Sequence, residues 1–457
     1  MSQPIQRFSS LPYFADSAKL FSLIVNQPWA VFLDSGYPAS NQGRIDILAA
    51  NPVCTLVTRG ESTEITRNHQ VRISKDDPFE LIKQQLSGYD LDAQGLPFNG
   101  GAIGYFSYDL ARRLEKLPAI AEDAEHIPEM AIGIYDWAVV VDHYQQTTHL
   151  VAQRCDELSW QALLKQFSQL PTEQIKTDFN VLSPVRANMD QQDYRRAFNK
   201  IKQYLKEGDC YQVNLAQRFV ADCEGDPWVA YQTLRQLNAA PFSAYLNMPG
   251  VQLLSSSPER FLKVTDGVVE TKPIKGTRPR GFNDIDDQQH VEDLQNSKKD
   301  RAENLMIVDL LRNDISKTCK KGSVKVPLLF DVESYATVHH LVSTVTGVLA
   351  EDQQALDLLR SCFPGGSITG APKIRSMEII EELEPHRRGV YCGAIGYIGF
   401  NGNMDTNIAI RTLVHSEGTI RFWAGGGIVN DSVADDEYQE CFDKAAALLD
   451  LLKQFQK

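Results

Sequence analysis

The sequence predicts an α+β fold, and two observations support this prediction. In the first 170 residues, short β-branched and aromatic runs are punctuated by Gly, Pro and Asp, which indicates mostly antiparallel strands and turns. The rest of the chain mixes strands with long amphipathic helices. Because strands and helices do not alternate one for one, an α+β arrangement suits the chain better than a doubly wound parallel sheet.

The elements follow in order along the chain. A polar stretch with two prolines and no sustained period predicts a linker over residues 171–189, between a region at 1–170 and a region at 190–457. Long helices are expected at Asp193–Glu207, Ser297–Arg312 and Asp435–Lys453. Strands are expected at 29–36, 52–60, 101–110 and 132–144 in the first region, and at 251–257, 393–400, 406–414 and 419–429 in the second.

Composition excludes several classes of protein. The 457 residues are 43% hydrophobic, which supports one large or two ordinary packed domains and excludes a disordered or fibrous chain. A net charge of -13 is opposite to the field of most nucleic-acid binders. The eight cysteines form no C-x-x-C pair, and there is no signal-peptide pattern or membrane-length apolar run. These features predict a cytoplasmic protein with reduced thiols and no membrane partner.

One hexapeptide is nearly repeated, at Gly101–Phe106 and at Gly393–Ile398. The separation is too long for a solenoid period. Either two related strands face each other across one core, or the similarity is a coincidence of strand composition.

Two predicted helices carry acids on their apolar faces. Glu437, Glu440 and Lys444 share a stripe with Cys441 and later leucines. Asp300 and Glu303 share a face with Ile307 and Leu310 in the same way. Buried carboxylates need a cation or a substrate, and an all-oxygen set favours Mg²⁺. The alternative is that these acids are solvated and complement helix dipoles.

Two glycine-containing stretches suggest anion binding. In residues 362–375, glycines precede Pro372 at the start of a predicted helix, so backbone amides and the hydroxyls of Ser367 and Thr369 could face an anion. The run Ala424–Ile428 follows a predicted strand and could form a backbone nest, or it could be only a turn.

A basic stretch, residues 271–280, contains Lys275 between Ile274 and Gly276. Desolvation in a narrow pocket would lower the pKa of this amine and make it nucleophilic, and Glu259 is a candidate acid or base. The alternative is a solvated basic turn with a surface acid. His340 and Arg411 stand in apolar runs, where such residues are usually satisfied parts of a core.

These segments together resemble the chorismate-utilising enzymes, in particular the synthase subunits that aminate chorismate. The resemblance implies a large antiparallel β-sandwich with outer helices, like that of anthranilate synthase component I, in which the two regions of the chain interleave in one fold. The first region is similar through LDSG at Leu33 and GGAIGYFSYDLARR at Gly100. The motifs of the second region are SPERF (257–261), PIKGTRPRG (273–281), ENLMIVDLLRND (303–314), HLVS (340–343), GGSITGAPK (365–373), GAIGY (393–397), DTNIAIRT (405–412) and AGGGIV with the downstream EYQE (424–440).

Lys275 discriminates within that family. Anthranilate synthase large subunits have alanine at the matching position, whereas aminodeoxychorismate synthase large subunits have lysine. The resemblance therefore implies amination of chorismate at C4 to 4-amino-4-deoxychorismate, for 4-aminobenzoate and folate synthesis. Lys275 would form a covalent intermediate at C2, and Glu259 would act as acid and then base.

The resemblance also implies roles for further residues. Glu303, Glu437 and Glu440 would bind Mg²⁺, and Asp300 stands where the anthranilate enzymes have glutamate, so its shorter arm is a poor direct ligand. His340 matches the histidine near the leaving hydroxyl. The positions that match substrate contacts are Ser367, Thr369, Tyr391, Arg411, Gly425, Gly427 and Lys444, and those that match a tryptophan pocket are Ser35, Arg44, Pro241, Phe242 and Ser243.

The expected partners follow from what the chain lacks. No Cys lies in a G-x-C-x-G setting, so ammonia should come from a separate glutamine amidotransferase subunit in a heterodimer. No lyase module follows residue 457, so 4-aminobenzoate should need another enzyme. Two rival hypotheses are anthranilate synthase component I and a non-catalytic, amino-acid-sensing subunit.

Overall fold

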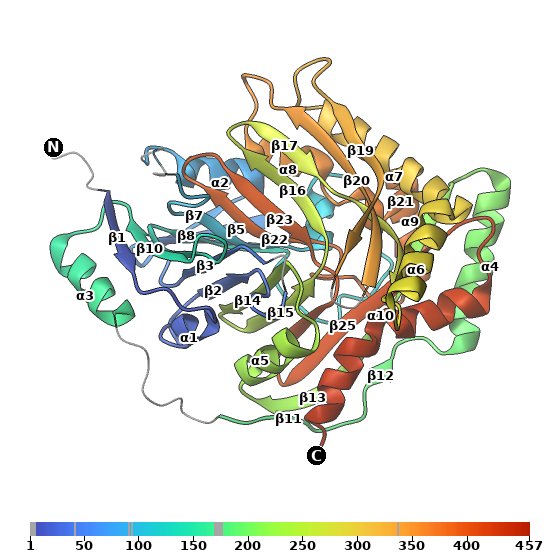
Figure 1. Cartoon of the computed structure of the whole chain (residues 1–457), viewed down its shortest axis with the longest axis horizontal. Coiled ribbons are helices and arrows are strands. Elements are labelled where there is room, and N and C mark those ends of the chain that lie inside the picture. The colour runs from blue at the N-terminus through green and yellow to red at the C-terminus, as the bar shows by residue number, and fades with distance from the viewer. Residues whose placement is uncertain (1–5, 41–42, 90–91, 93–94, 169–176, 336–337) are drawn as a thin grey trace.

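Two large antiparallel sheets pack face to face, with helices outside them, so the predicted α+β fold is confirmed (Figure 1). The computed structural model describes residues 6–40, 43–89, 92, 95–168, 177–335 and 338–457. Within these ranges no helix has the length and apolar character needed to cross a membrane.

The first sheet draws strands from both regions of the chain. Its described strands are β1 (Arg7–Leu11), β2 (Ala30–Asp34), β3 (Ile45–Ala49), β9 (Trp137–Asp142), β10 (Thr147–Ala152), β11 (Phe179–Val181), β12 (Arg186–Ala187), β13 (Gln212–Gly225), β14 (Phe242–Met248), β15 (Val251–Ser257), β21 (Gly370–Ala371), β24 (Thr412–Ser416) and β25 (Thr419–Ile428). Their order is β1-β10-β9-β3-β2-β14-β15-β24-β25-β13-β11, and β12 and β21 also pair with β13. The β2–β14 pair joins the two regions.

The second sheet also draws strands from both regions of the chain. Its described strands are β4 (Cys54–Arg59), β5 (Ser62–Arg67), β6 (Gln70–Ser74), β7 (Gly101–Phe106), β8 (Met130–Tyr135), β16 (Arg260–Thr265), β17 (Val268–Thr271), β18 (Ile274–Pro279), β19 (Lys325–Ser334), β20 (Val338–Val348), β22 (Ala394–Gly399) and β23 (Met404–Ile408). Their order is β18-β20-β17-β16-β23-β22-β7-β8-β4-β5-β6, with β19 pairing with β20.

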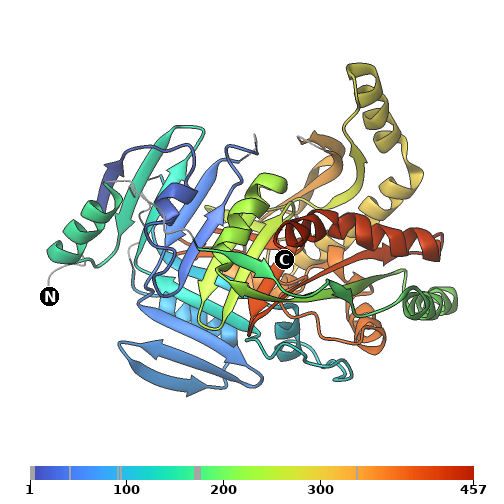
Figure 2. The same ribbon diagram turned by 90° about the horizontal axis from the view of Figure 1, so that it is seen from below.

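Helices cover the outer faces and one end of the sandwich. Figures 1 and 2 show α10 lying along β25 and β13, and α6 and α7 at the end opposite the N-terminal strand. The three expected long helices are confirmed as α4, α7 and α10, with small shifts at their ends. The described helices are α1 (Ala18–Phe21), α2 (Pro78–Leu86), α3 (Glu157–Phe167), α4 (Gln191–Glu207), α5 (Pro227–Leu237), α6 (Asp284–Asn296), α7 (Lys298–Ser316), α8 (Ala355–Cys362), α9 (Lys373–Leu383), α10 (Ala434–Gln454) and the 3₁₀ turns η1 (Tyr108–Arg113) and η2 (Gly366–Ile368).

The main core lies between the sheets, and a second core lies under the outer helices. Alternation along β2 shows the division: Val31 belongs to the core between the sheets, and Phe32 packs with Phe21 of α1 and Trp228 of α5. Successive side chains of a strand point to opposite faces, so one strand supplies both cores. Seven of the eight cysteines are buried, and none forms a disulfide.

The repeated hexapeptide forms two neighbouring strands of one sheet. β7 pairs with β22, and Gly104 lies opposite Gly396. The alternative in which the two strands face each other across one core is therefore wrong, because the two copies are hydrogen-bonded side by side. A Cβ atom at either glycine would clash with a carbonyl oxygen of the next strand, at Ala131 or at Asp405.

The structure describes only part of the expected linker. Residues 171–176 lie outside the described residues. From Thr177 to Met189 the chain contains β11 and β12, which both pair with β13. This part of the chain is therefore built into the first sheet.

Candidate active site

Lys275 lies on β18 and points to the carboxylate of α7. Its Nζ is 3.0 Å from Glu303 Oε1, and it donates to the backbone oxygen of Ser367 at 3.1 Å. The side chain is 14% exposed. The register of β18 against β20 shifts between Ile274 and Thr277, so Lys275 stands at an irregularity of the strand. The alternative of a solvated turn is therefore wrong for this lysine.

Glu259 is buried beside the same loop. Ser367 Oγ donates to Glu259 Oε1 at 3.1 Å, so Ser367 contacts both Lys275 and Glu259. Burial raises the pKa of Glu259, although the charge of Lys275 opposes the rise. The alternative of a surface acid is wrong, because the residue is 7% exposed.

The pKa of Lys275 differs from the expectation. Burial does lower it, as the sequence suggested, but the nearby charges of Glu303 and Glu259 outweigh burial and raise the pKa above its ordinary value. The carboxylates that surround the amine were absent from the sequence argument, which considered only desolvation.

The acids of α10 converge on a glycine of β25. A Cβ at Gly426 would lie 3.0 Å from Glu437 Oε2 and 3.4 Å from Glu440 Oε1. Glu437 is 3% exposed, and in the described part of the chain its Oε2 has no hydrogen-bond partner. Only a glycine leaves room for both carboxylates here.

The Glu303 carboxylate already contacts other side chains of the protein. Its Oε1 lies 3.2 Å from Gln212 Nε2, in addition to the contact with Lys275. Asp300, one turn earlier on α7, binds Arg278 at 2.9 Å. Across the described ranges, no three His, Cys, Asp or Glu side chains stand close enough to hold a metal ion. The donor set nevertheless suits Mg²⁺, because all of it is carboxylate oxygen and one buried oxygen, Glu437 Oε2, lacks a partner.

Arg411 is an unpaired cation in this region. Burial lowers the pKa of its guanidinium, and no carboxylate pairs with it in the residues that the structure describes. It approaches His340 closely enough to lower the pKa of that imidazole. A partly buried guanidinium without a counter-ion is suited to the carboxylate of a ligand.

His340 has a partner but is held neutral. Its Nδ1 lies 2.8 Å from Thr277 Oγ1, and the Tyr335 ring packs against it edge-on at 5.1 Å. Burial, with a contribution from Arg411, lowers the pKa of His340 to about 4. The imidazole therefore has a hydrogen bond of the kind expected for a core histidine.

The remaining substrate candidates divide by position. Tyr391 stacks on Trp423 with ring centres 6.1 Å apart, and Lys444 donates to Gly425 O at 3.0 Å and pairs with Glu440 at 2.7 Å. Thr369 differs from the expectation: its buried hydroxyl lies within reach of the Gly365 and Gly366 carbonyls, so its hydrogen is used inside its own loop.

The glycine run also differs from the expectation. Gly425 and Gly427 lie inside β25, opposite Ala216 and Asn214 of β13. They form neither a nest nor a turn after the strand. A side chain at Gly427 would clash with the amides of Gln212 and Asn214.

Gln212 and Asn214 are polar residues that the sequence reasoning missed. Both are buried on β13, and in the described residues Gln212 Oε1 and Asn214 Oδ1 accept no hydrogen bond. Polar residues at alternate positions of an otherwise apolar strand were the available signal.

A large cavity lies between the sheets in the described part of the chain. It has a volume of about 950 Å³, and Lys275, Glu259, Ser367 and Glu303 do not line it. All five residues of the expected tryptophan pocket do line it, namely Ser35, Arg44, Pro241, Phe242 and Ser243.

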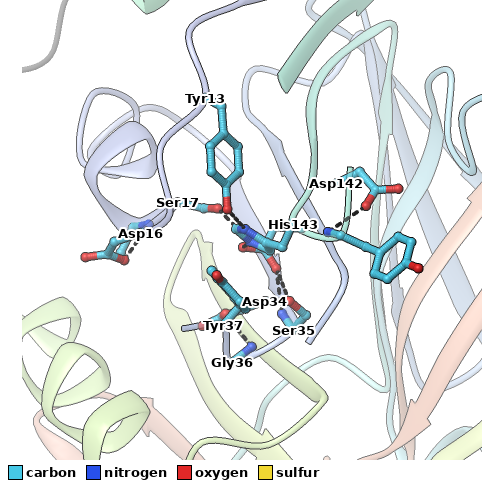
Figure 3. A network of polar contacts seen from close by, with 12 residues as sticks. Tyr13, Asp16, Ser17, Asp34, Ser35, Gly36, Tyr37, Asp142 and His143 are labelled. Atoms are coloured by element: carbon cyan, nitrogen blue, oxygen red, sulfur yellow. Dashed lines mark hydrogen bonds and ion pairs between the residues drawn. The ribbon is translucent and has the colours of Figure 1, made fainter. Parts of the chain in front are cut away.

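A buried polar network supports the Ser35 wall of this cavity (Figure 3). Asp46 Oδ1 accepts from both the backbone N–H and the hydroxyl of Ser35, at 2.7 and 2.6 Å. Its Oδ2 lies 2.8 Å from His143 Nε2, and the Tyr37 ring stacks on that imidazole. The hydrogen of the Ser35 hydroxyl is therefore directed away from the cavity.

Comparisons with known proteins show the family of the chain. A family model described as chorismate binding enzyme matches residues 30–450. Aminodeoxychorismate synthase component 1 of Escherichia coli (strain K12) is 50% identical over 95% of each chain, and anthranilate synthase component 1 of Acetivibrio thermocellus is 37% identical over 95% of this chain and 92% of that one.

A solved structure shows the same fold. Anthranilate synthase component I from Streptococcus pneumoniae TIGR4 superposes with a TM-score of 0.79, at 32% identity, and the match covers 89% of this chain and 92% of that one. The resemblance inferred from the motifs is confirmed. The chain belongs to the family of chorismate-binding enzymes.

Proposed function

We propose that this enzyme aminates chorismate at C4 and releases 4-amino-4-deoxychorismate, a precursor of 4-aminobenzoate and folate. The name of its 50% identical relative, aminodeoxychorismate synthase component 1, supports this reaction. The observation that carries the proposal is the position of Lys275, because a buried amine and a buried acid both contact Ser367.

In the first step, the neutral Lys275 amine bonds to C2 of the ring. The two conjugated ring double bonds both shift, to C1=C6 and C4=C5, the C4–O bond breaks, and the hydroxyl leaves as water with a proton from Glu259. The step needs a protonated Glu259 and a neutral Lys275. One proton between the two residues provides both forms when it resides on Glu259, because the amine is then free to attack. The raised pKa of Glu259 favours that arrangement, and the carboxylates that raise the pKa of Lys275 oppose it.

In the second step, ammonia bonds to C4 and both double bonds shift back, to C5=C6 and C1=C2. The C2–Nζ bond breaks and returns the neutral lysine, and the Glu259 carboxylate takes a proton from the new amino group. The sum is chorismate and ammonia giving the amino product and water, and both residues regain their starting forms.

Substrate binding is assigned to cationic and polar groups around Lys275. Arg411 would hold a substrate carboxylate, since it has no protein counter-ion in the described residues. Ser367, Tyr391, Lys444 and the backbone at Gly425 and Gly427 would complete the site. His340, which stays neutral, would lie near the leaving hydroxyl.

Glu303, Glu437 and Glu440 are the residues that would hold Mg²⁺. The ion would neutralise the ring carboxylate and the charge that develops as the hydroxyl leaves. The unpartnered Glu437 Oε2 supports this assignment. Ammonia would be supplied by a separate glutamine amidotransferase subunit, and the relative's name, component 1, supports a second component.

The 950 Å³ cavity is assigned to tryptophan. The five expected residues all line it, which supports the assignment. Because Ser35 directs its hydroxyl hydrogen to Asp46, its oxygen is available as an acceptor for the ammonium group of an amino acid.

The identity of the product tests the proposal. The purified chain is incubated with chorismate, Mg²⁺ and an ammonium salt, and products are separated and weighed by mass spectrometry. We expect 4-amino-4-deoxychorismate, and 4-aminobenzoate only after a lyase is added. Fluorescent anthranilate would show that the chain acts as an anthranilate synthase, and binding of chorismate without turnover would favour a sensing subunit.

A further inference from the structure

We infer that Arg388 is a positioning residue for this reaction: with Glu384 it fixes the loop at residues 366–369, whose Ser367 contacts both Lys275 and Glu259. The inference rests on the proposed function for its effect on catalysis. It concerns a residue that stands outside the substrate and metal sets described above.

Arg388 and Glu384 form a fully buried ion pair. The side chains are 1% and 4% exposed. Arg388 Nε and Nη2 donate to the two carboxylate oxygens of Glu384 at 2.9 and 2.7 Å, which is the bidentate geometry of a planar guanidinium.

The remaining donors of Arg388 hold backbone oxygens. Nη1 donates to Ile368 O at 3.0 Å, and Nη2 donates to Asn214 O at 3.1 Å. The guanidinium therefore joins the loop to strand β13. The loop is also tied directly to that strand, since Asn214 N donates to Thr369 O at 2.9 Å.

Glu384 is also hydrogen-bonded to β13. Its Oε1 accepts from the backbone N–H of Ala216 at 2.9 Å, so both members of the pair are anchored to β13. A pair with this many partners is rigid, and removal of one member leaves the other buried and uncompensated.

Ile368, whose backbone oxygen binds Arg388, directly follows Ser367 in the chain. The backbone oxygen of Ser367 receives the Lys275 amine, and its hydroxyl binds Glu259. The spacing of the amine and the acid therefore depends on where this loop is held. Misplacement of reacting groups by about 1 Å can cost about a hundredfold in rate.

The guanidinium also lies 5.5 Å from the centre of the Tyr391 ring. Tyr391 is a substrate candidate, so a change at Arg388 should also affect substrate binding to a smaller extent. A lysine at 388 would keep the charge but lose the planar fork, and it could not hold Glu384, Ile368 and Asn214 together.

The chain supplies a matched control near the C-terminal end of α9. Glu381 precedes Glu384 by three residues, is 6% exposed, and pairs with Arg112. It accepts from the backbone N–H groups of Ile120 and Ala121, at 2.8 and 3.0 Å, and so holds residues 120–121 and not the loop at 366–369. Substitution of Glu381 should lower stability without moving the catalytic loop.

The experiment compares Arg388→Lys and Glu384→Gln with Glu381→Gln in the full chain. Steady-state rates are measured with chorismate and ammonium, and amide hydrogen exchange is measured by mass spectrometry in the peptide 363–372. We expect Arg388→Lys to lower kcat about tenfold or more, to change KM by less than threefold, and to speed exchange in this peptide. We expect Glu381→Gln to lower the Tm about as much as Arg388→Lys and Glu384→Gln do, and to keep kcat within twofold of the wild-type value.

Two results would overturn the inference: wild-type kcat and exchange in Arg388→Lys, or a loss of kcat in Glu381→Gln that equals the loss in Glu384→Gln. If Arg388→Lys does not fold, the comparison of the two glutamine variants decides. An inactive wild-type chain would contradict the proposed function, and in that case the exchange rates still decide whether Arg388 fixes the loop.

Discussion

Ile274 and Lys275 are neighbours on β18 and belong to two different sites. Ile274 lines the cavity between the sheets, and the Lys275 amine binds Glu303 and Ser367. Pro258 and Glu259 show the same relationship, because Pro258 lines the cavity and Glu259 binds Ser367. The cavity and the candidate active site therefore share two segments of backbone.

Tryptophan should stabilise the protein by filling the cavity. A ligand at one hundred times its Kd stabilises a folded protein by about 2.7 kcal/mol, which is measurable as a concentration-dependent rise in Tm. Ser35→Ala should weaken the effect about tenfold or more, because it removes the acceptor next to the ammonium group. Ser87→Ala, at the exposed end of α2, is the control. A Tm that does not respond to tryptophan would refute the assignment.

Lys275→Ala should abolish a covalent adduct with chorismate. Intact-mass measurement of the wild-type chain with chorismate, without ammonia, should detect the adduct, and the variant should show only the unmodified mass. Lys272→Ala is the matched control, since Lys272 pairs with Glu333 instead. Normal turnover by Lys275→Ala would eliminate the nucleophile from the mechanism.

Glu303→Gln should weaken the dependence on Mg²⁺. A neutral amide is a poorer ligand for this ion than a carboxylate, so the Mg²⁺ concentration for half-maximal activity should rise about tenfold or more, equal to about 1.4 kcal/mol. Asp309→Asn, on the same helix and paired with Arg312, should leave this concentration unchanged. Removal of Mg²⁺ with a chelator should stop wild-type turnover, and full activity in chelator would contradict the role of the metal.

His340 should make stability depend on pH in the acidic range. Its pKa is about 4 when folded, set by burial and by Arg411, against about 6.5 in an unfolded chain. The unfolded state therefore binds the proton first, so the wild-type protein loses stability as the pH falls below 6.5 towards 4. Between pH 7.5 and pH 5.0 this group should account for a loss of about 2 kcal/mol.

His340→Gln should remove that part of the pH dependence. Urea unfolding at the two pH values measures it, and the difference in stability between wild type and variant should shrink at pH 5.0. His69→Asn, at an exposed position, should leave the wild-type slope in place. An unchanged slope in His340→Gln would show that other groups are responsible.

Local sequence patterns predicted the elements well. The three long helices were placed to within a few residues, because apolar periodicity and cap residues such as Asp190 and Ser297 are local signals. The inward position of Glu437 was visible in the same periodicity. Ordered motifs such as SPERF and PIKGTRPRG indicated the family before any contact was known.

Contacts between segments that are far apart in the chain could not be predicted from the sequence. The charges of Glu259 and Glu303 reverse the expected direction of the Lys275 pKa shift, and Thr369 turns its hydroxyl into its own loop. Arg388 carried no signal, since an arginine between helix α9 and a strand is ordinary until its partners are seen.

The sequence by itself determined the α+β class, the helices, the family and the candidate nucleophile, because each of these depends on the order and spacing of residues along the chain. Only the tertiary structure decided that Ser367 joins Lys275 to Glu259, that the repeated strands β7 and β22 are neighbours, and that Arg388 joins the loop at residues 366–369 to β13. The physical reason is that charge interactions and hydrogen bonds depend on distance in space, and segments 100 residues apart acquire that distance only when the sheets assemble.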